Sequence, residues 1–181
     1  MTASSSITEM LAQSQEVLTK PSVATFERFE DRGTLADALI YVAVAAAITG
    51  VFGLTGGLGG FVGNILATLL GFFAFTFLVY WLGRQRGGTG TLNQVAYSFA
   101  LFWAPLSVLF GVLSFVLLIT IIGILALPLV AIAALVANVY FAYLAVQSSL
   151  NLQGGGTVWV VLLLAAIGTF AVNMLVAAMV R

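Results

Sequence analysis

The longest uncharged stretch of this chain limits what it can fold into. Between positions 87 and 180 no side chain is ionised at neutral pH, and of all 181 residues 62% are hydrophobic and only 7% are charged. A soluble domain carries about 25% charged residues, whereas about 18 consecutive apolar residues already indicate a membrane-spanning helix. The sequence therefore predicts an integral membrane protein.

Short breaks divide the apolar part into separate stretches. We predict an all-α fold, a polytopic transmembrane helical bundle of five spans. At about 1.5 Å per residue, roughly 20 residues cross a hydrocarbon core of about 30 Å; four stretches exceed that length and the first is marginal. The third and fourth could form one re-entrant element, but Gly123 and Pro128 favour a tight turn, with Pro128 in the first turn of the next helix. The transmembrane domain is expected at 38–181, with spans at about 38–55, 58–82, 96–120, 125–147 and 158–180.

The polar residues 1–37 are predicted to form a cytoplasmic, amphipathic helical segment, which we call the foot. Its sequences SITE (6–9) and TLAD (34–37) both match the capping box, in which the first and fourth side chains bond each other's backbone N–H. Pro21 is expected to end the first helix. Aromatic side chains lie on one side of the short helix that follows, and we expect them at the membrane interface. These interfacial residues are Phe26 and Phe29.

Basic residues set the expected orientation. The foot holds three of them, and the loop GRQRGGTG (83–90) holds Arg84 and Arg86, whereas the other short loops have none. The positive-inside rule places both segments in the cytoplasm, so five spans leave the C-terminus outside. Arg84 and Arg86 are predicted to fix this orientation and to contact anionic lipid headgroups, at about 1 kcal/mol each.

Other roles for the glycine-rich segments find little support. One Arg-Gly-Gly copy supplies two charges, whereas segments that bind single-stranded nucleic acid use repeated electrostatic contacts. The loop lacks the lysine and fixed spacing of a phosphate-binding P-loop, and TGGLGGFVGN (55–64) lacks the spacing of a dinucleotide fingerprint. We therefore expect no nucleic-acid partner and no cofactor.

Small residues recur at intervals of four along the second predicted span. Such a stripe lets two helix backbones approach closely in lipid, so we predict a packing face, within one subunit or between subunits. Asn138 and Asn173 lie in similar stripes, and we expect their carboxamides to bond across a helix interface; a polar path for a substrate is the alternative. The predicted packing residues are Gly59, Gly63, Ala67, Gly71, Asn138 and Asn173.

The ionisable side chains argue against catalysis. The chain has no Cys and no His, which removes thiolate nucleophiles, sulfur-ligated metals and the commonest proton carrier. The predicted spans contain hydroxyls, but no acid or base that could activate one, and no ionisable relay for proton-coupled transport. We expect no catalytic residues, no metal site and no enzyme activity.

Two motifs resemble those of the Yip1 domain family of five-span membrane proteins. One is the Pro-x4-Phe of VLTKPSVATF (17–26); the other is GGTGTLNQVAYSFALFWAP (87–105), a Gly-Gly-x-Gly leading into a Tyr…Pro span. The resemblance covers about residue 10 to the end and is closest to the prokaryotic branch. It implies a five-helix bundle with a cytosolic N-terminus.

The same resemblance bears on partners. Eukaryotic members are linked to trafficking at the Golgi and endoplasmic reticulum and to prenylated Rab GTPases. This chain lacks their long cytosolic N-terminal region and their Asp-Leu-Tyr-Gly-Pro motif, so a Rab-type partner is doubtful.

The sequence as a whole predicts a non-enzymatic membrane adaptor or organiser. It would act through helix–helix and lipid contacts, with a protein partner or as a homo-oligomer. We expect it in the plasma membrane of a bacterium or archaeon, with the N-terminus cytoplasmic and the C-terminus outside. The alternative is a small transporter, channel or lipid scramblase. Its path would be lined by hydroxyls and by Asn64, Asn138 and Asn173.

Overall fold

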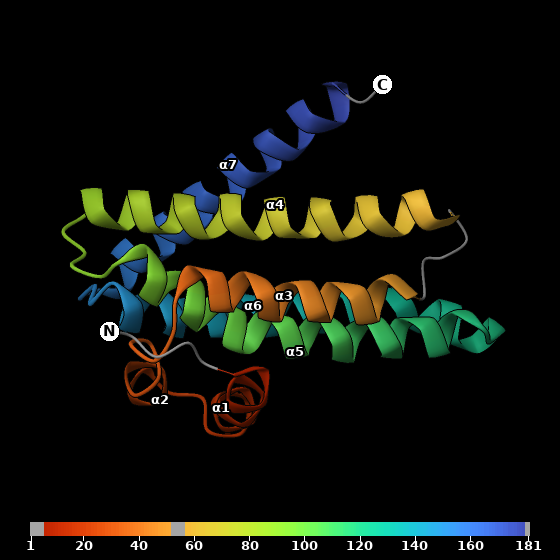
Figure 1. Ribbon diagram of the computed structural model, residues 1–181, viewed down its shortest axis with the longest axis horizontal. Helices are drawn as coiled ribbons and strands as arrows, with labels where there is room; N and C mark the ends of the chain where they lie inside the picture. The colour runs from red at the N-terminus through yellow and green to blue at the C-terminus, as the bar shows by residue number, and fades with distance from the viewer. Residues whose placement is uncertain (1–5, 52–56, 180–181) are drawn as a thin grey trace.

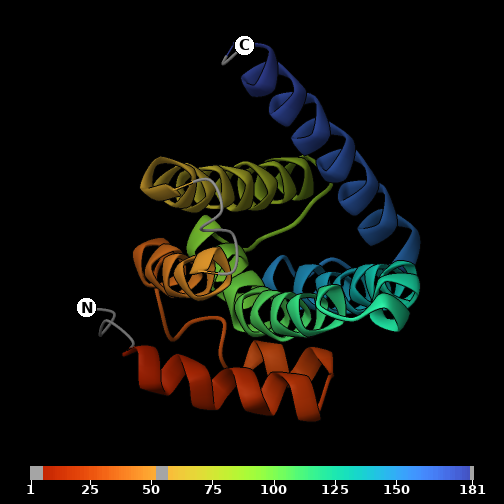
Figure 2. The same cartoon turned by 90° about the vertical axis from the view of Figure 1, so that its right-hand side faces the viewer.

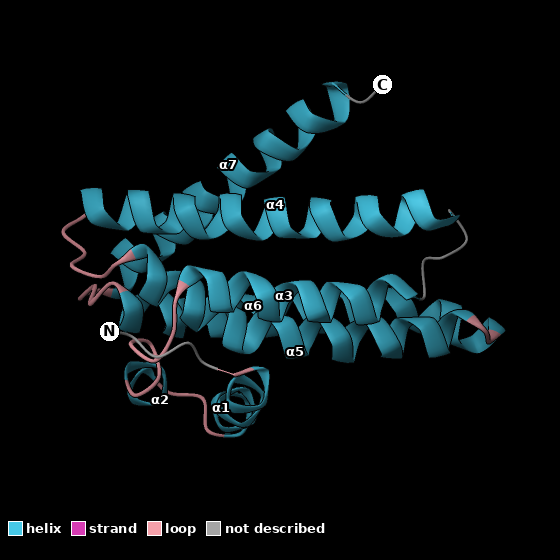
Figure 3. Ribbon diagram, in the orientation of Figure 1, coloured by secondary structure: helices cyan, strands magenta, loops and turns pink. Residues whose placement is uncertain are grey.

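The computed structural model describes residues 6–51 and 57–179, which form seven helices and, within these ranges, no strand (Figures 1 and 3). The prediction of an all-α fold is confirmed. The helices are α1 (Ile7–Thr19), α2 (Val23–Glu27), α3 (Leu35–Gly50), α4 (Gly57–Gln85), α5 (Leu92–Leu118), α6 (Ile121–Ser149) and α7 (Gly155–Met179).

Helices α3 to α7 coincide with the five predicted apolar stretches, but they differ in length. Four of them, α4 to α7, are long and apolar enough to cross a membrane. Helix α3 has 16 residues and, at about 1.5 Å per residue, extends about 24 Å, less than a typical hydrocarbon core. The described residues thus contain four candidate spans and one shorter apolar helix.

Local capping chemistry explains where the first helices begin. Ser6 and Glu9 form a capping box at α1, and Thr34 and Asp37 form another at α3, as predicted. A third capping box, formed by Thr91 at α5, was not predicted. Helix α1 ends just before the proline at position 21, which cannot continue it.

The turn between α5 and α6 lies earlier than predicted. Helix α5 ends at Leu118 and α6 begins at Ile121, with Thr120 as its N-cap, accepting a hydrogen bond from Gly123 N at 3.0 Å. Gly123 is inside the first turn of α6, where an added Cβ would lie within 2.7 Å of Leu117 backbone atoms. Pro128 lies deeper inside α6, not in its first turn. The two helices form a hairpin whose close approach needs glycine.

The helices divide into three groups. Helix α5 packs most closely with α3 and α6, and α4 packs most closely with α7. Helices α1 and α2 are seen end-on in Figure 1 and lengthwise in Figure 2, so they run across the others. We call the end of the bundle that carries α1, α2 and the loops 86–91 and 150–154 the polar end, and the opposite end the distal end.

The protein core lies in the half of the bundle near the polar end. Helix α5 is almost continuously buried from Val95 to Ala104, and its Phe102 ring stacks at 5.8 Å on Phe141 of α6. The distal halves of α5 and α6 instead expose large apolar side chains, such as Leu125 and Leu129. Large apolar side chains exposed over whole helix faces suit a lipid surrounding and not water.

Candidate functional site

The foot is docked onto the bundle through buried polar contacts. The Tyr97 hydroxyl of α5 donates to Gln13 Oε1 at 2.8 Å, and the buried Ser14 hydroxyl of α1 lies 3.1 Å from the Tyr41 hydroxyl of α3. Gly33 is packed against the Tyr97 ring, where an added Cβ would come within 2.8 Å of three ring carbons. The first helix is therefore part of the folded bundle.

Phe26 and Phe29 are buried in the protein, which corrects their predicted place at the membrane interface. Phe26 is fully buried and meets the Phe102 ring edge-on at 6.2 Å, while Phe29 is almost fully buried, with the Arg28 guanidinium 4.9 Å from its ring centroid. Packing against the helices removes the apolar surface of both side chains from water, and this burial holds the foot on the bundle.

The apolar residues of α1 face two different surroundings. Met10 and Val17 are buried against the bundle, whereas Ile7 and Leu11 are exposed. Ile7 and Leu11 line one end of an apolar groove of about 680 Å³ that continues along α3 and α5. The foot thus exposes an apolar strip of α1 beside this groove. The sequence shows the helical periodicity of α1, but it does not show which face of α1 packs on the protein.

A buried carboxyl group joins the foot to α6. Glu30, which is 6% exposed, accepts a hydrogen bond from the Ser148 hydroxyl. Burial raises the pKa of Glu30, and the neighbouring Asp31 and Glu27 raise it further, while the Ser148 bond acts in the opposite direction. The docked foot therefore favours the protonated form of this carboxyl group.

The loop GRQRGGTG is a backbone junction between the ends of α4 and α6. Thr89 N donates to Leu150 O at 3.0 Å, and Gly88 N donates to Gly83 O at 2.9 Å. A Cβ on Gly90 would lie within 2.8 Å of the Ser149 carbonyl group. The glycines are needed for this close approach. Because the N–H groups of residues 86–89 already have carbonyl partners, they do not form a phosphate nest.

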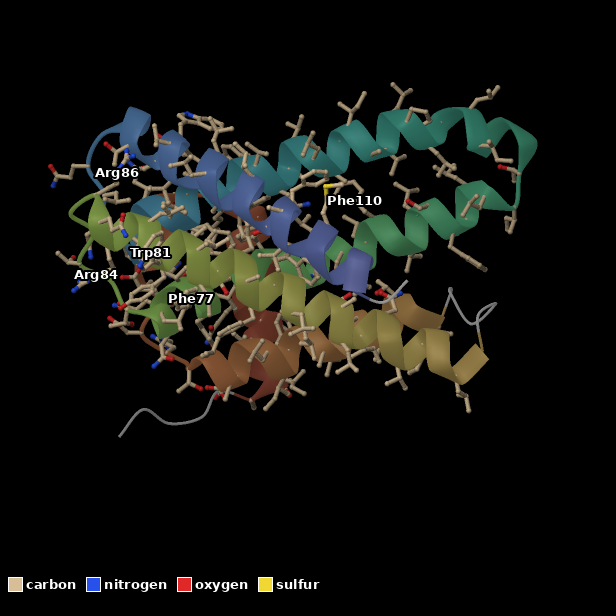
Figure 4. The ribbon with its side chains drawn as sticks, turned by 90° about the horizontal axis from the view of Figure 1, so that it is seen from above. Phe77, Trp81, Arg84, Arg86 and Phe110 are labelled. Atoms are coloured by element: carbon tan, nitrogen blue, oxygen red, sulfur yellow. The ribbon has the colours of Figure 1, made fainter. Side chains whose placement is uncertain are left out.

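The two arginines of this loop have different surroundings. Arg84 Nη1 donates to Gly88 O at 3.3 Å and to Thr89 O at 3.2 Å, so it stabilises its own loop. Among the described residues Arg86 makes no such bond, and its side chain is exposed. Figure 4 shows both at the polar end, with Trp81 and then Phe77 further along α4. A headgroup role stays a prediction for both, and Arg86 is the better placed.

The small-residue stripe of α4 does not pack within the subunit. A Cβ added to Gly59, Gly63 or Gly71 would meet no atom within 4 Å, and the Ala67 side chain is exposed. The prediction of a packing face within the chain is wrong here. Packing between subunits stays a prediction.

The two asparagines gave different outcomes. Asn138 Nδ2 donates to Ala134 O of its own helix at 2.8 Å, so the predicted bond across a helix interface is not what the structure shows. The side chain of Asn173 lies outside the described residues. Hydroxyls in the apolar helices behave like Asn138, since Thr76, Ser107 and Thr169 all donate to carbonyls of their own helix.

A cleft of about 480 Å³ lies between α4, α5, α6 and α7. Its walls are mainly apolar and aromatic, including Phe72, Phe99 and Trp103, with a few polar atoms from side chains such as Asn138 and Thr169. Sequence reasoning did not find this cleft, because its walls come from four helices far apart in the chain. Within the described ranges no group of acidic side chains could hold a metal ion.

These features together define an all-α integral membrane protein with a folded polar end. The model of the Yip1 domain family matches residues 16–175, most of the chain. The chain belongs to the Yip1 domain family. No curated protein and no solved structure matches it.

The family motifs correspond to two contacts of the polar end. The Pro-x4-Phe motif ends at Phe26, which anchors the foot on α5. The Gly-Gly-x-Gly motif supplies Gly88 and Gly90, which approach the end of α6. Both motifs thus build the docking of foot and loop onto the bundle.

Proposed function

We propose that this protein is a non-enzymatic membrane adaptor or organiser that presents a folded polar end to a partner. The observation that carries the proposal is the docked foot. Its helix α1 has a face buried on the bundle, an exposed apolar strip with Ile7 and Leu11, and a further exposed face with Glu9, Ala12 and Thr19. A helix with these three faces lies at the membrane surface, with this further face turned to water.

In the proposed arrangement the foot is cytoplasmic and α3 is a short fifth span. Helix α3 starts at the polar end and packs along α5. The 24 Å that it extends can be accommodated by local thinning of the bilayer, at a fraction of a kcal/mol per Å. The basic residues of the foot and the 83–90 loop lie at the same end, which agrees with the positive-inside rule.

Polar groups in the apolar helices favour this proposal over a transporter or channel. A hydrated path needs groups that are available to a permeating solute or its water. The Asn138 carboxamide and the Thr169 hydroxyl instead donate to their own helices. Of the buried side-chain polar atoms in the described residues, only Ser98 Oγ lacks a hydrogen-bond partner. A single such atom does not line a hydrated path.

Photocrosslinking tests the adaptor function. A photoreactive residue replaces the exposed Ala12, which lies on α1 away from both the buried face and the Ile7–Leu11 strip, and the matched control replaces Leu125, which is 78% exposed at the distal end. We expect protein adducts at position 12 and lipid adducts at position 125 in native membranes. The partner is then identified by mass spectrometry. A second copy is one possible partner, and a crosslinker at Gly63 tests the α4 stripe for it.

Reconstitution tests the alternative. The pure protein is placed in liposomes, and solute flux and lipid scrambling are measured against protein-free vesicles. We expect both to stay at the protein-free level. Flux or scrambling above that level, together with no protein adduct at position 12, would overturn the proposed function.

A further inference from the structure

The cleft between α4, α5, α6 and α7 opens toward the membrane. Its inner walls include Phe99 and Phe102, each 1% exposed, whereas Trp159 and Leu163 on its rim are 45% and 58% exposed. Helix α7 packs along α4 and makes few contacts with α6, and Figure 2 shows it leaning away from the other helices. The cleft is therefore continuous with the apolar surface that faces lipid.

The depth of the cleft matches one leaflet. On α7 it is lined from Trp159, near the polar end, to Thr169. Ten residues of helix extend about 15 Å, which is half of a hydrocarbon core of about 30 Å. Trp159 packs on Tyr143 with ring centroids 5.5 Å apart, and such aromatic pairs are typical of the level of the lipid headgroups.

The polar atoms of the lining give a hydrated ligand little to bind. Asn138 Nδ2 and Thr169 Oγ1 each donate at 2.8 Å to a carbonyl of their own helix, and Thr68 Oγ1 lies 3.4 Å from Asn64 Oδ1. A water molecule is retained in a buried site when it finds two to four polar partners. The cleft instead offers aromatic and aliphatic walls, which suit a hydrocarbon chain.

We propose that this cleft is a binding site for one acyl chain of a glycerolipid from the leaflet at the polar end. The chain enters between α6 and α7, runs from the level of Trp159 to that of Thr169, and contacts Trp103 on the inner wall. The site rests on the membrane insertion in the proposed function and deepens its lipid contacts. It does not require a protein partner.

Tryptophan quenching by brominated lipid tests the site. Trp103 and Trp159 line the cleft, whereas Trp81 does not. A variant with Trp81→Phe and Trp159→Phe retains Trp103 as its fluorophore. It is reconstituted in phosphatidylcholine vesicles with bromines midway along the acyl chain, and in unbrominated vesicles. We expect strong quenching of Trp103, although its side chain is partly buried in the protein.

Plugging the cleft provides the decisive comparison. Gly71 lines it, and a Cβ added there meets nothing within 4 Å, so Gly71→Leu fills the cleft without displacing backbone. Gly63→Leu is the matched control, since Gly63 has the same open surroundings on the same helix but does not line the cleft. We expect Gly71→Leu to reduce the quenching of Trp103 several-fold and Gly63→Leu to leave it unchanged.

Two results would overturn the site: Trp103 unquenched in the unplugged protein, or quenching equal in both leucine variants. If Gly71→Leu fails to fold, Ala166→Leu plugs the cleft from α7 and takes its place. Failure of the acyl-chain site leaves the crosslinks at position 12 unaffected, so it is distinguishable from failure of the adaptor function.

Discussion

Replacing Gly33 with alanine should release the foot from the bundle. The added Cβ would lie within 2.8 Å of three ring carbons of Tyr97, whereas carbon atoms in contact lie about 3.5–4.0 Å apart. The Tyr97 side chain is fully buried, so the ring cannot move away without disturbing its neighbours. The foot or the ring must shift by at least about 1 Å to remove this clash.

The energetic cost follows from these contacts. Overpacking a dense core costs about 1–3 kcal/mol. If Tyr97 turns to make room, it also loses its bond to Gln13, at about 1 kcal/mol. The total of about 2–4 kcal/mol corresponds to an increase in the undocked population of about 30-fold to 700-fold, since about 1.4 kcal/mol is tenfold.

Hydrogen exchange of the protein in nanodiscs measures this population. Exchange of the α1 amides should accelerate by the same factor while α5 stays protected, because local opening sets local exchange. Gly156→Ala is the control, since its added Cβ meets no atom within 4 Å. Tyr97→Phe should cost only the hydrogen bond, and Tyr97→Phe should not rescue Gly33→Ala, because the ring carbons remain. Unchanged α1 exchange in Gly33→Ala would refute the reasoning.

Three further predictions concern the polar end. Burial raises the pKa of Glu30 above its ordinary value of 4.5, so docking of the foot should be strongest below pH 4.5 and weaken as the pH rises through the raised pKa. Glu30→Gln should make the protection of the α1 amides against exchange less dependent on pH, and a pH dependence equal to that of the unsubstituted protein would contradict this prediction. Gly90→Ala places a Cβ against the Ser149 carbonyl group and should destabilise the protein by about 3 kcal/mol, the upper end of overpacking costs. Melting experiments in detergent measure this loss, and Gly156→Ala, whose added Cβ meets no atom within 4 Å, should leave the melting temperature unchanged. A cysteine at Gln85, at the end of α4, should resist an impermeant label in intact cells and one at Ile119, which is 72% exposed, should react; the reverse labelling would invert the orientation.

Local sequence signals predicted the helices and their starts because those signals act over a few residues. The capping boxes of α1 and α3 satisfy backbone N–H groups within one turn. The α5–α6 turn was misplaced because Gly123 and Pro128 are strong breakers in water but are common inside membrane helices. The signal that marked the true turn was Thr120, an N-cap residue within an apolar run.

Contacts between distant residues could not be predicted from the same signals. Helical periodicity places Phe26 and Phe29 on one face of the foot, but not whether that face meets lipid or protein. The 83–90 loop was predicted to fix the orientation of the chain, but the contacts of its glycines with Ser149, the last residue of α6, and with Leu150 could not be predicted from the loop itself. The cleft depends on the angle of α7, which no pattern in a single helix records.

The division between a tight polar end and an open distal end has a physical cause. In lipid, apolar side chains gain little by meeting another helix, because lipid tails are equally apolar. Close packing must then come from hydrogen bonds and small residues, and these gather at the polar end, as in Tyr97–Gln13, Glu30–Ser148 and Gly90 against Ser149. Helices α6 and α7 make few contacts with each other and have little reason to close. An acyl chain from the leaflet at the polar end can therefore enter the cleft between them without breaking a polar contact, while the foot keeps its bonds to α5 and α6.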